Sequence, residues 1–395
     1  MTDLPPPSAF AKHWTLDPSI VFLNHGSFGA TPRVVLEAQA ELRARMERNP
    51  MQFFLRDLES LLDETRGALA RFVDARPEDL VFVPNATTGV NAVLRSLEVR
   101  SGDELLTTNH EYNACKNVLD FVATRAGGSV VVANVPFPLA SEGEVVSAII
   151  SKTTARTRLL LVDHVTSPTG LVLPIARIAA AMAERGIDVL VDGAHAPGML
   201  DLSLGALSKH VAFYTANCHK WLCTPKGSAF LWVREDKQRG VRPHVISHGA
   251  NSPRTDRSRY LVEFDWMGTI DPTAIFCIPK SIDFLVGLAP AFREVNRSLA
   301  LEARRILCDA LDVAPPAPES MIGALAAVPL PDGEVRPASA LYGDPLQDVL
   351  FREHAIEVPI VPWPAPPKRL VRISAQLYNS RAQYEYLART LRTRL

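Results

Sequence analysis

Short apolar runs alternate with amphipathic stretches between residues 80 and 233, and this alternation restricts the fold more than any other feature of the chain. The apolar runs have the composition of buried strands and lie at residues 80–84, 105–108, 130–135, 159–162, 187–192, 213–214 and 229–233. Helical patterns separate the first five runs. Because parallel neighbours in a sheet need a helical crossover, we predict an α/β fold with a mostly parallel sheet covered by helices on both faces.

One lysine, Lys220, lies in the polar turn between the last two apolar runs. Burying an ammonium group costs several kcal/mol unless the group is neutralised or paired. Lys220 is therefore either an amine that forms a Schiff base with a carbonyl compound, or a lysine at the mouth of a hairpin whose charged end reaches solvent. This stretch alone favours neither reading.

Asp192 ends the apolar run at residues 187–192, at the edge where α/β sheets place their ligands. A buried carboxylate needs a cationic partner, and a protonated pyridine nitrogen is such a partner. A lysine Schiff base combined with an aspartate on a pyridinium nitrogen is the protein's half of pyridoxal-phosphate chemistry.

Four separated motifs resemble the class V aminotransferase family of fold-type I pyridoxal-phosphate enzymes, and within it the isopenicillin N epimerase-like branch. They are LNHGSFG at residues 23–29, VDGAH at 191–195, TANCHKWLCTPKG at 215–227 and RISAQLYN at 372–379. The resemblance implies a large domain with a mostly parallel sheet sandwiched by helices, and a smaller α+β C-terminal domain. It is specific for the cofactor and the fold, and much less so for the reaction.

The resemblance also implies which residues contact the ring of pyridoxal 5'-phosphate. Lys220 would form the Schiff base, and Asp192 would keep the pyridine nitrogen protonated. Tyr112 would stack on the ring, unless it only packs against the start of a helix. His195 would bond to the phenolic oxygen, with Thr166 nearby, although each could lie in a turn without such a contact.

A second implied group binds the cofactor phosphate. It consists of Thr87, Thr88 mainly through its backbone, Asn217, His219 and, from the second subunit of a homodimer with shared active sites, Thr269. A helix beginning after residue 85 would present free N–H groups to this anion. The alternative reading of Thr87 and Thr88 is that they only cap that helix.

The substrate expected from the resemblance is a small molecule with an amino-acid centre. Arg372 would clamp its α-carboxylate, because a guanidinium fork matches a carboxylate; the alternative is an arginine on a solvated edge strand. Asn24 and His25 would point toward the substrate. Lys220 would act as the base at the α-carbon, and Tyr112 and His25 are the candidates for a second acid or base.

The fate of the α-carbanion decides the reaction, and the residues do not decide that fate. We expect an amino-acid epimerase, with a C–S lyase or an aminotransferase as alternatives. A cysteine desulfurase would need a nucleophilic cysteine in the C-terminal half, and residues 312–395 contain none. A binding module that has lost the cofactor would lack Lys220, Asp192 or Arg372, and all three are present.

Composition and charge argue against several other classes of protein. The 395 residues carry a formal net charge of −1 without a basic stripe, so no nucleic-acid partner is expected. No signal peptide or membrane-spanning apolar run is evident, and five cysteines without CxxC spacing suggest a reducing cytoplasm rather than disulfides or zinc. His244 and His248 have the spacing of helical metal ligands, but Pro243 opposes a helix there, so no metal is expected.

Three parts are predicted along the chain. Residues 1–32 form an N-terminal arm and substrate loop, 33–275 the large cofactor-binding domain, and 276–395 the small C-terminal domain. Apolar periodicity predicts helices at 53–73 and at 273–311, the latter a long connection into the small domain.

Overall fold

A seven-stranded sheet organises the large part of the molecule in the computed structural model, which describes residues 4–333 and 344–395. Its strands are β2 (Leu80–Val83), β3 (Glu104–Thr108), β4 (Ser129–Ala133), β5 (Thr157–Asp163), β6 (Asp188–Asp192), β7 (Phe213–Asn217) and β8 (Ala229–Val233). They are ordered β2-β8-β7-β6-β5-β3-β4, and β8 alone among them runs antiparallel to its neighbours. The predicted mostly parallel sheet is confirmed.

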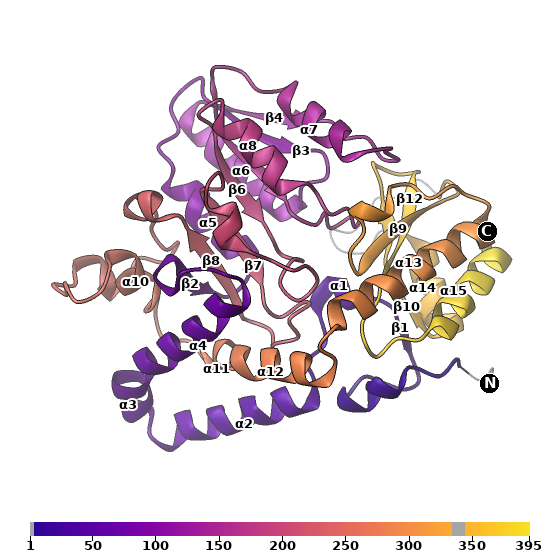
Figure 1. Cartoon of the computed structure of the whole chain (residues 1–395), viewed down its shortest axis with the longest axis horizontal. Coiled ribbons are helices and arrows are strands. Elements are labelled where there is room, and N and C mark those ends of the chain that lie inside the picture. Colours follow the sequence, from indigo (N-terminus) through magenta and orange to yellow (C-terminus); the bar gives the residue numbers. More distant parts are fainter. Residues whose placement is uncertain (1–3, 334–343) are drawn as a thin grey trace.

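Helices cover both faces of this sheet (Figure 1). One face is covered by α5 (Ala86–Ser96) and α6 (Asn113–Ala126), and the other by α4 (Leu58–Phe72), α7 (Glu142–Ile150) and α8 (Ile175–Ala183). Alternate residues of each strand pack into different cores: Leu159 and Leu161 contact the first set of helices, and Leu160 and Val162 the second. This alternation follows from the two-residue period of a strand.

A second, antiparallel sheet lies in the C-terminal region, drawn orange to yellow in Figure 1. It is formed by β9 (Leu325–Leu330), β11 (Ile360–Pro362) and β12 (Arg369–Ser374), with β12 in the centre. It packs with α13 (Phe292–Leu311), α14 (Pro345–His354) and α15 (Arg381–Arg394). Near the N-terminus, β1 (Val21–Phe22) pairs in parallel with β10 (Ile356–Glu357) and joins the same core.

The remaining helices are α1 (His25–Phe28), α2 (Arg33–Arg48), α3 (Pro50–Gln52), α9 (Leu204–Leu207), α10 (Arg259–Phe264), α11 (Thr273–Phe276) and α12 (Ile278–Leu288). Residues 1–3 of the predicted arm and 334–343 of the predicted small domain lie outside the described residues.

One predicted helix is wrong as a continuous element, and a second differs at its start. The expected helix at 273–311 is divided into α11, α12 and α13, with a bend of 70° before α13. Pro290 lies in this break, where its missing N–H and its effect on the extended Ala289 prevent a helix from continuing. The expected helix at 53–73 begins with a π-helical turn, Phe53–Asp57, before α4.

Within residues 4–333 and 344–395, no single helix has both the length and the apolar character needed to cross a membrane. The bent pair formed by Thr273–Leu288 and Phe292–Leu311 passes the same test of length and composition when its two halves are taken together.

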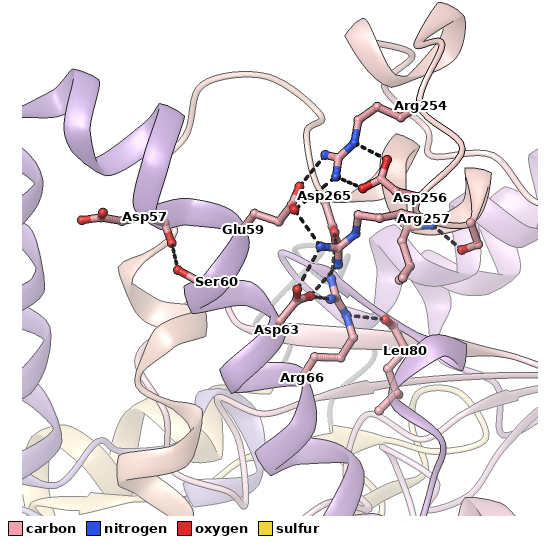
Figure 2. A network of polar contacts seen from close by, with 12 residues as sticks. Asp57, Glu59, Ser60, Asp63, Arg66, Leu80, Arg254, Asp256, Arg257 and Asp265 are labelled. Atoms are coloured by element: carbon pink, nitrogen blue, oxygen red, sulfur yellow. Dashed lines mark hydrogen bonds and ion pairs between the residues drawn. The ribbon is translucent and has the colours of Figure 1, made fainter.

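A network of ion pairs anchors the segment around α10 to α4 (Figure 2). Arg66 of α4 is 2% exposed, donates from Nε to the carbonyl of Leu80 at 3.0 Å, and pairs with Asp265 at 2.5 Å. Arg257 pairs with Asp63 of α4 and lies 3.6 Å from Asp265. Because the buried guanidinium and carboxylate neutralise each other, this network fixes the start of the loop that carries Thr269.

Replacing Arg66 tests how much this buried pair stabilises the fold. Arg66→Met leaves the carboxylate of Asp265 without its shortest partner, so we expect a loss of about 3–5 kcal/mol in the free energy of unfolding. Urea unfolding measures it. Arg254→Met is the matched control, because Arg254 is 40% exposed and its pairs with Glu59 and Asp256 should contribute about 1 kcal/mol or less. Equal losses in the two variants would contradict the assignment.

Candidate active site

Lys220 lies in the turn between β7 and β8, and its side chain is half-buried. Its Nζ atom is 3.1 Å from Nε2 of His195, which follows β6. Burial lowers the pKa of Lys220 to about 8, and the positive charge of Arg372 acts in the same direction. Asp192 and Asp163 oppose this shift, so they lie close enough for their charges to act on the amine. Lys220 is thus easier to deprotonate than an exposed lysine.

The hydrogen bonds of His195 define the protonation of this pair. The indole Nε1 of the buried Trp221 donates to Nδ1 of His195 at 3.2 Å. Burial, helped by the charge of Lys220, holds the pKa of His195 well below its usual value, so the imidazole is neutral and carries its hydrogen on Nε2. That hydrogen points to Nζ of Lys220, which can accept it only as an uncharged amine.

Asp192 lies at the end of β6 and is 3% exposed. The backbone N–H of Ala194 donates to its Oδ1 at 2.9 Å, and the thiol of Cys115 donates to its Oδ2 at 3.2 Å. Burial raises the pKa of Asp192 above its ordinary value despite these two hydrogen bonds. Asp192 is therefore a buried acid at the strand end, the position that the sequence predicted for it.

The N-terminus of α5 is held by two asparagines. Asn85 accepts a hydrogen bond from the backbone N–H of Thr88 at 2.8 Å, and Asn217 accepts one from Ala86 at 2.8 Å. The N–H of Thr88 is thus already engaged, which does not favour the expected phosphate contact through its backbone. Within the described residues, the hydroxyl of Thr87 forms no hydrogen bond and stays available to a ligand.

The hydrogen bond of His219 does not favour its expected contact with the cofactor phosphate. Its Nδ1 donates to the carbonyl of Ser228 at 3.1 Å. Burial lowers its pKa to about 4, so the ring is neutral at neutral pH. The remaining Nε2 then accepts hydrogen bonds rather than donating them. A phosphate oxygen would find no donor there.

Arg372 is buried in β12, the central strand of the small sheet, with 5% of its surface exposed. This position rules out the solvated edge strand considered from the sequence. Its Nη1 donates to the carbonyl of Ser167 at 2.7 Å, and its Nη2 to Ser27 at 2.8 Å and to Asn24 at 3.5 Å. Nε is buried without a partner among the described residues.

The guanidinium of Arg372 is therefore surrounded by neutral oxygens. Burial lowers its pKa to about 10, which still leaves it protonated at neutral pH. A buried cation with an unused donor requires an anion to complete its surroundings. Arg372 thus provides binding for a carboxylate close to Lys220, an amine that loses its proton more easily than an exposed lysine.

His25 is completely buried, and both of its ring nitrogens contact protein atoms. Nδ1 is 2.8 Å from the hydroxyl of Tyr378, and Nε2 is 3.0 Å from the carbonyl oxygen of Lys220. Burial lowers the pKa of His25 to about 3. These contacts do not favour the expected exchange of protons with a substrate. They show that His25 supports the turn that carries Lys220.

Gly29 allows the LNHGSFG motif to pack against the turn that carries Lys220. Its φ of 71° is in the left-handed region, and a Cβ atom on it would lie 2.1 Å from the carbonyl oxygen of His219. The glycine therefore allows close approach to the Lys220 turn rather than to a ligand.

Three further candidates lie apart from one another. The hydroxyl of Thr166 is occupied by Thr169 at 2.7 Å and by the N–H of Leu171 at 2.9 Å. Tyr112 precedes α6 and is 43% exposed. Thr269 is exposed in the loop after α10.

Sequence reasoning missed several residues of this site. They are Ser27, Cys115, Ser167 and Trp221, which contact Arg372, Asp192 or His195. Cys115 could have been found, because it lies at the start of the helix that follows β3. The serines carry no distinguishing signal in the sequence.

Comparisons with known proteins agree on the fold. The family described as Aminotransferase class-V matches residues 21–301. Isopenicillin N epimerase of Amycolatopsis lactamdurans is 37% identical over 393 residues, covering 96% of each protein. A probable chloroplastic L-cysteine desulfhydrase of Arabidopsis thaliana is 29% identical, covering 96% of this chain and 83% of that protein. A solved mutant of C-DES, with glycine covalently linked to its PLP cofactor, has a TM-score of 0.80 at 21% identity, covering 97% and 98%.

His25→Leu tests the supporting role of this histidine. The substitution leaves the Tyr378 hydroxyl without its partner and removes one of two donors to the Lys220 carbonyl, which also accepts from the N–H of Cys223, so we expect a loss of about 2 kcal/mol in the free energy of unfolding. Tyr378→Phe removes only one of the two contacts and should cost about 1 kcal/mol. Both are measured by urea unfolding. A His25→Leu protein as stable as the wild type would refute the role.

Proposed function

The chain belongs to the class V aminotransferase family, and from this membership we propose that it is a pyridoxal-phosphate enzyme that epimerises the α-carbon of an amino-acid substrate. The observation that carries the proposal is the pairing of the Lys220 amine, whose pKa burial lowers to about 8, with a buried Arg372 that lacks an anionic partner among the described residues. The choice of epimerisation follows the similarity to isopenicillin N epimerase over 96% of the chain.

The side chains at the site fit the cofactor. Lys220 supplies an amine for the aldehyde, and Asp192 supplies a buried acid for the pyridine nitrogen. The N-terminus of α5, with the free hydroxyl of Thr87, supplies donors for the phosphate. His195 contacts Lys220 and is placed to bond an oxygen beside it.

When bound, pyridoxal phosphate supplies a carbonyl carbon for amines and a ring that withdraws electrons from the substrate's α-carbon. Arg372 holds the α-carboxylate through its forked donors. Nζ of Lys220 takes the proton from the α-carbon on one face, and His195 orients that amine. Inversion requires a proton from the opposite face.

We assign that second proton to Tyr112. Burial raises the pKa of its phenol, so it keeps a proton at neutral pH and can donate it. The phenol also lies within reach of the charge of Arg372, and its side chain is partly exposed. His25 is not assigned this role, because both of its nitrogens are engaged.

A second candidate is a C–S lyase. The similarity to an L-cysteine desulfhydrase supports it, and the same base and clamp would serve it. A route through a protein persulfide is not proposed, because all five cysteines are buried and their thiols lie outside the reach of solvent.

Incubation in deuterated water separates the two candidates. With isopenicillin N as substrate, an epimerase incorporates deuterium at the inverted α-carbon without forming a keto acid; with L-cysteine, a lyase releases sulfide and pyruvate. Mass spectrometry and a keto-acid assay measure these products. Lys220→Ala should lose both the visible absorbance of the bound cofactor and the reaction. An unchanged absorbance in that variant would overturn the assignment of Lys220.

We also propose that two copies form a homodimer in which Thr269 of one approaches the cofactor phosphate of the other. Thr269 is exposed, and the adjacent Ile270 is 51% exposed. Ile270 and Phe54 line one apolar recess, and Met51 and Leu55 of the same helical segment are 62% and 67% exposed. Apolar surface of this extent is typical of a protein interface.

The free, buried cysteines support a cytoplasmic location as part of this proposal.

Leu55→Asp tests the dimer. A charge placed in an apolar interface should shift the protein from dimer to monomer in sedimentation experiments and weaken cofactor binding. Phe351→Asp is the matched control, because Phe351 is 44% exposed on α14, outside the proposed interface, and should leave the dimer intact. A wild-type protein that sediments as a monomer would contradict the proposal.

A further inference from the structure

Three buried acids lie at the ends of three neighbouring strands. Glu111 follows β3, Asp163 ends β5 and Asp192 ends β6, and they are 7%, 3% and 3% exposed. Asp163 and Asp192 are direct neighbours in the register of the sheet. Carboxylate oxygens of Glu111 and Asp192 lie within 4.8 Å of each other and of the Cys115 thiol. The three carboxyl groups are thus buried together at one edge of the sheet.

The surroundings of this group contain little positive charge. The titratable groups that act on it are Lys220 from the β7–β8 turn, Cys115 and Tyr112 from the start of α6, and Tyr214 from β7. Lys220 is the one basic side chain among them, set against three carboxyl groups. Like charges that are buried together with fewer cations than anions cannot all ionise. Some of the three acids must therefore hold protons.

The distribution of hydrogen-bond donors indicates which acids hold them. Asp192 receives two donors, the N–H of Ala194 and the thiol of Cys115. Oδ2 of Asp163 and Oε1 of Glu111 are buried without any donor from the described residues, whereas the other oxygen of Glu111, Oε2, accepts from the Thr107 hydroxyl at 3.2 Å. A carboxylate anion requires donors at its oxygens, whereas a protonated carboxyl group carries its own hydrogen. The anion is therefore best placed on Asp192.

We propose that Glu111 and Asp163 are proton-holding positioning residues that leave Asp192 as the single negative charge facing the pyridine nitrogen. Burial and the neighbouring acids raise the pKa of both residues well above the usual range, in agreement with this arrangement. One pyridinium cation then meets one carboxylate, and the charges of that pair cancel. The part played by the pyridine rests on the proposed function; the protonation of the two acids does not.

Proton release on unfolding tests the proposal. Glu111 and Asp163 would be protonated in the folded chain and ionised in the unfolded chain above about pH 4, so unfolding releases their protons at pH 7. Their contribution to stability is complete below the unfolded pKa and is lost as the pH rises toward the raised folded pKa. Glu111→Gln and Asp163→Asn should each reduce the release by about one proton and gain stability relative to the wild type between pH 4 and pH 8.

Calorimetry in buffers of different ionisation enthalpy counts these protons on the full chain, with and without added pyridoxal phosphate. Glu263→Gln is the matched control. Glu263 is similarly buried but lies in ion pairs with Arg242 and Arg259, so its variant reports the effect of removing a buried carboxyl group that has cationic partners.

The outcomes separate this inference from the proposed function. Proton release that is unchanged in both variants would show that Glu111 and Asp163 are ionised in the folded state, and would overturn the inference. If Glu111→Gln does not fold, Asp163→Asn alone decides, because it lies on a different strand. A wild type that shows the expected proton release but no visible absorbance with pyridoxal phosphate would refute the proposed cofactor and support the protonation.

Discussion

The contact between Lys220 and His195 is the interaction on which the site depends. A donor-only indole, Trp221, occupies Nδ1 of the imidazole, so the hydrogen of His195 lies on Nε2 and is directed at Nζ of the lysine. An ammonium group on Lys220 would point its own N–H donors at the Nε2–H donor of His195. This hydrogen bond thus favours the uncharged form of the lysine, in addition to the removal of water around it.

Close backbone packing places this pair at the sheet edge. Gly29 brings the N-terminal motif against the turn of Lys220, and His25 closes that contact by bonding to the lysine's carbonyl oxygen. On the other side, a Cβ atom on Gly89 would lie 2.0 Å from Oγ1 of Thr215, so α5 packs directly on β7. The two glycines draw the start of α5 and the N-terminal motif toward one strand end. Side chains from distant parts of the chain can therefore reach the same ligand.

Charge is distributed in the site so that each end of a substrate or cofactor finds an opposite charge. Arg372 lacks an anion and faces neutral oxygens, which suits a carboxylate. Asp192 lacks a strong cation and receives only two weak donors, which suits a pyridinium. Lys220 lies between these charges and responds to both. These charged groups lack a full set of partners within the protein. A buried charge in surroundings of low dielectric constant strongly favours a ligand group of opposite charge.

The sequence by itself determined the sheet, the strand ends and the identity of the reactive residues, because these depend on local periodicity and on rare polar residues beside apolar runs. Lys220 and Asp192 could be selected as candidates in this way, whereas Arg372 was selected through the resemblance of its stretch to the family motif. Only the tertiary structure decided that His25 supports a turn, that the Thr88 N–H is already capped, and that Pro290 divides the helix expected at 273–311. The partners of His25 lie 195 and 353 residues away along the chain. Residue spacing does not show which polar groups come into contact at such separations, nor which of several nearby acceptors, such as Asn85 for Thr88, takes a given N–H.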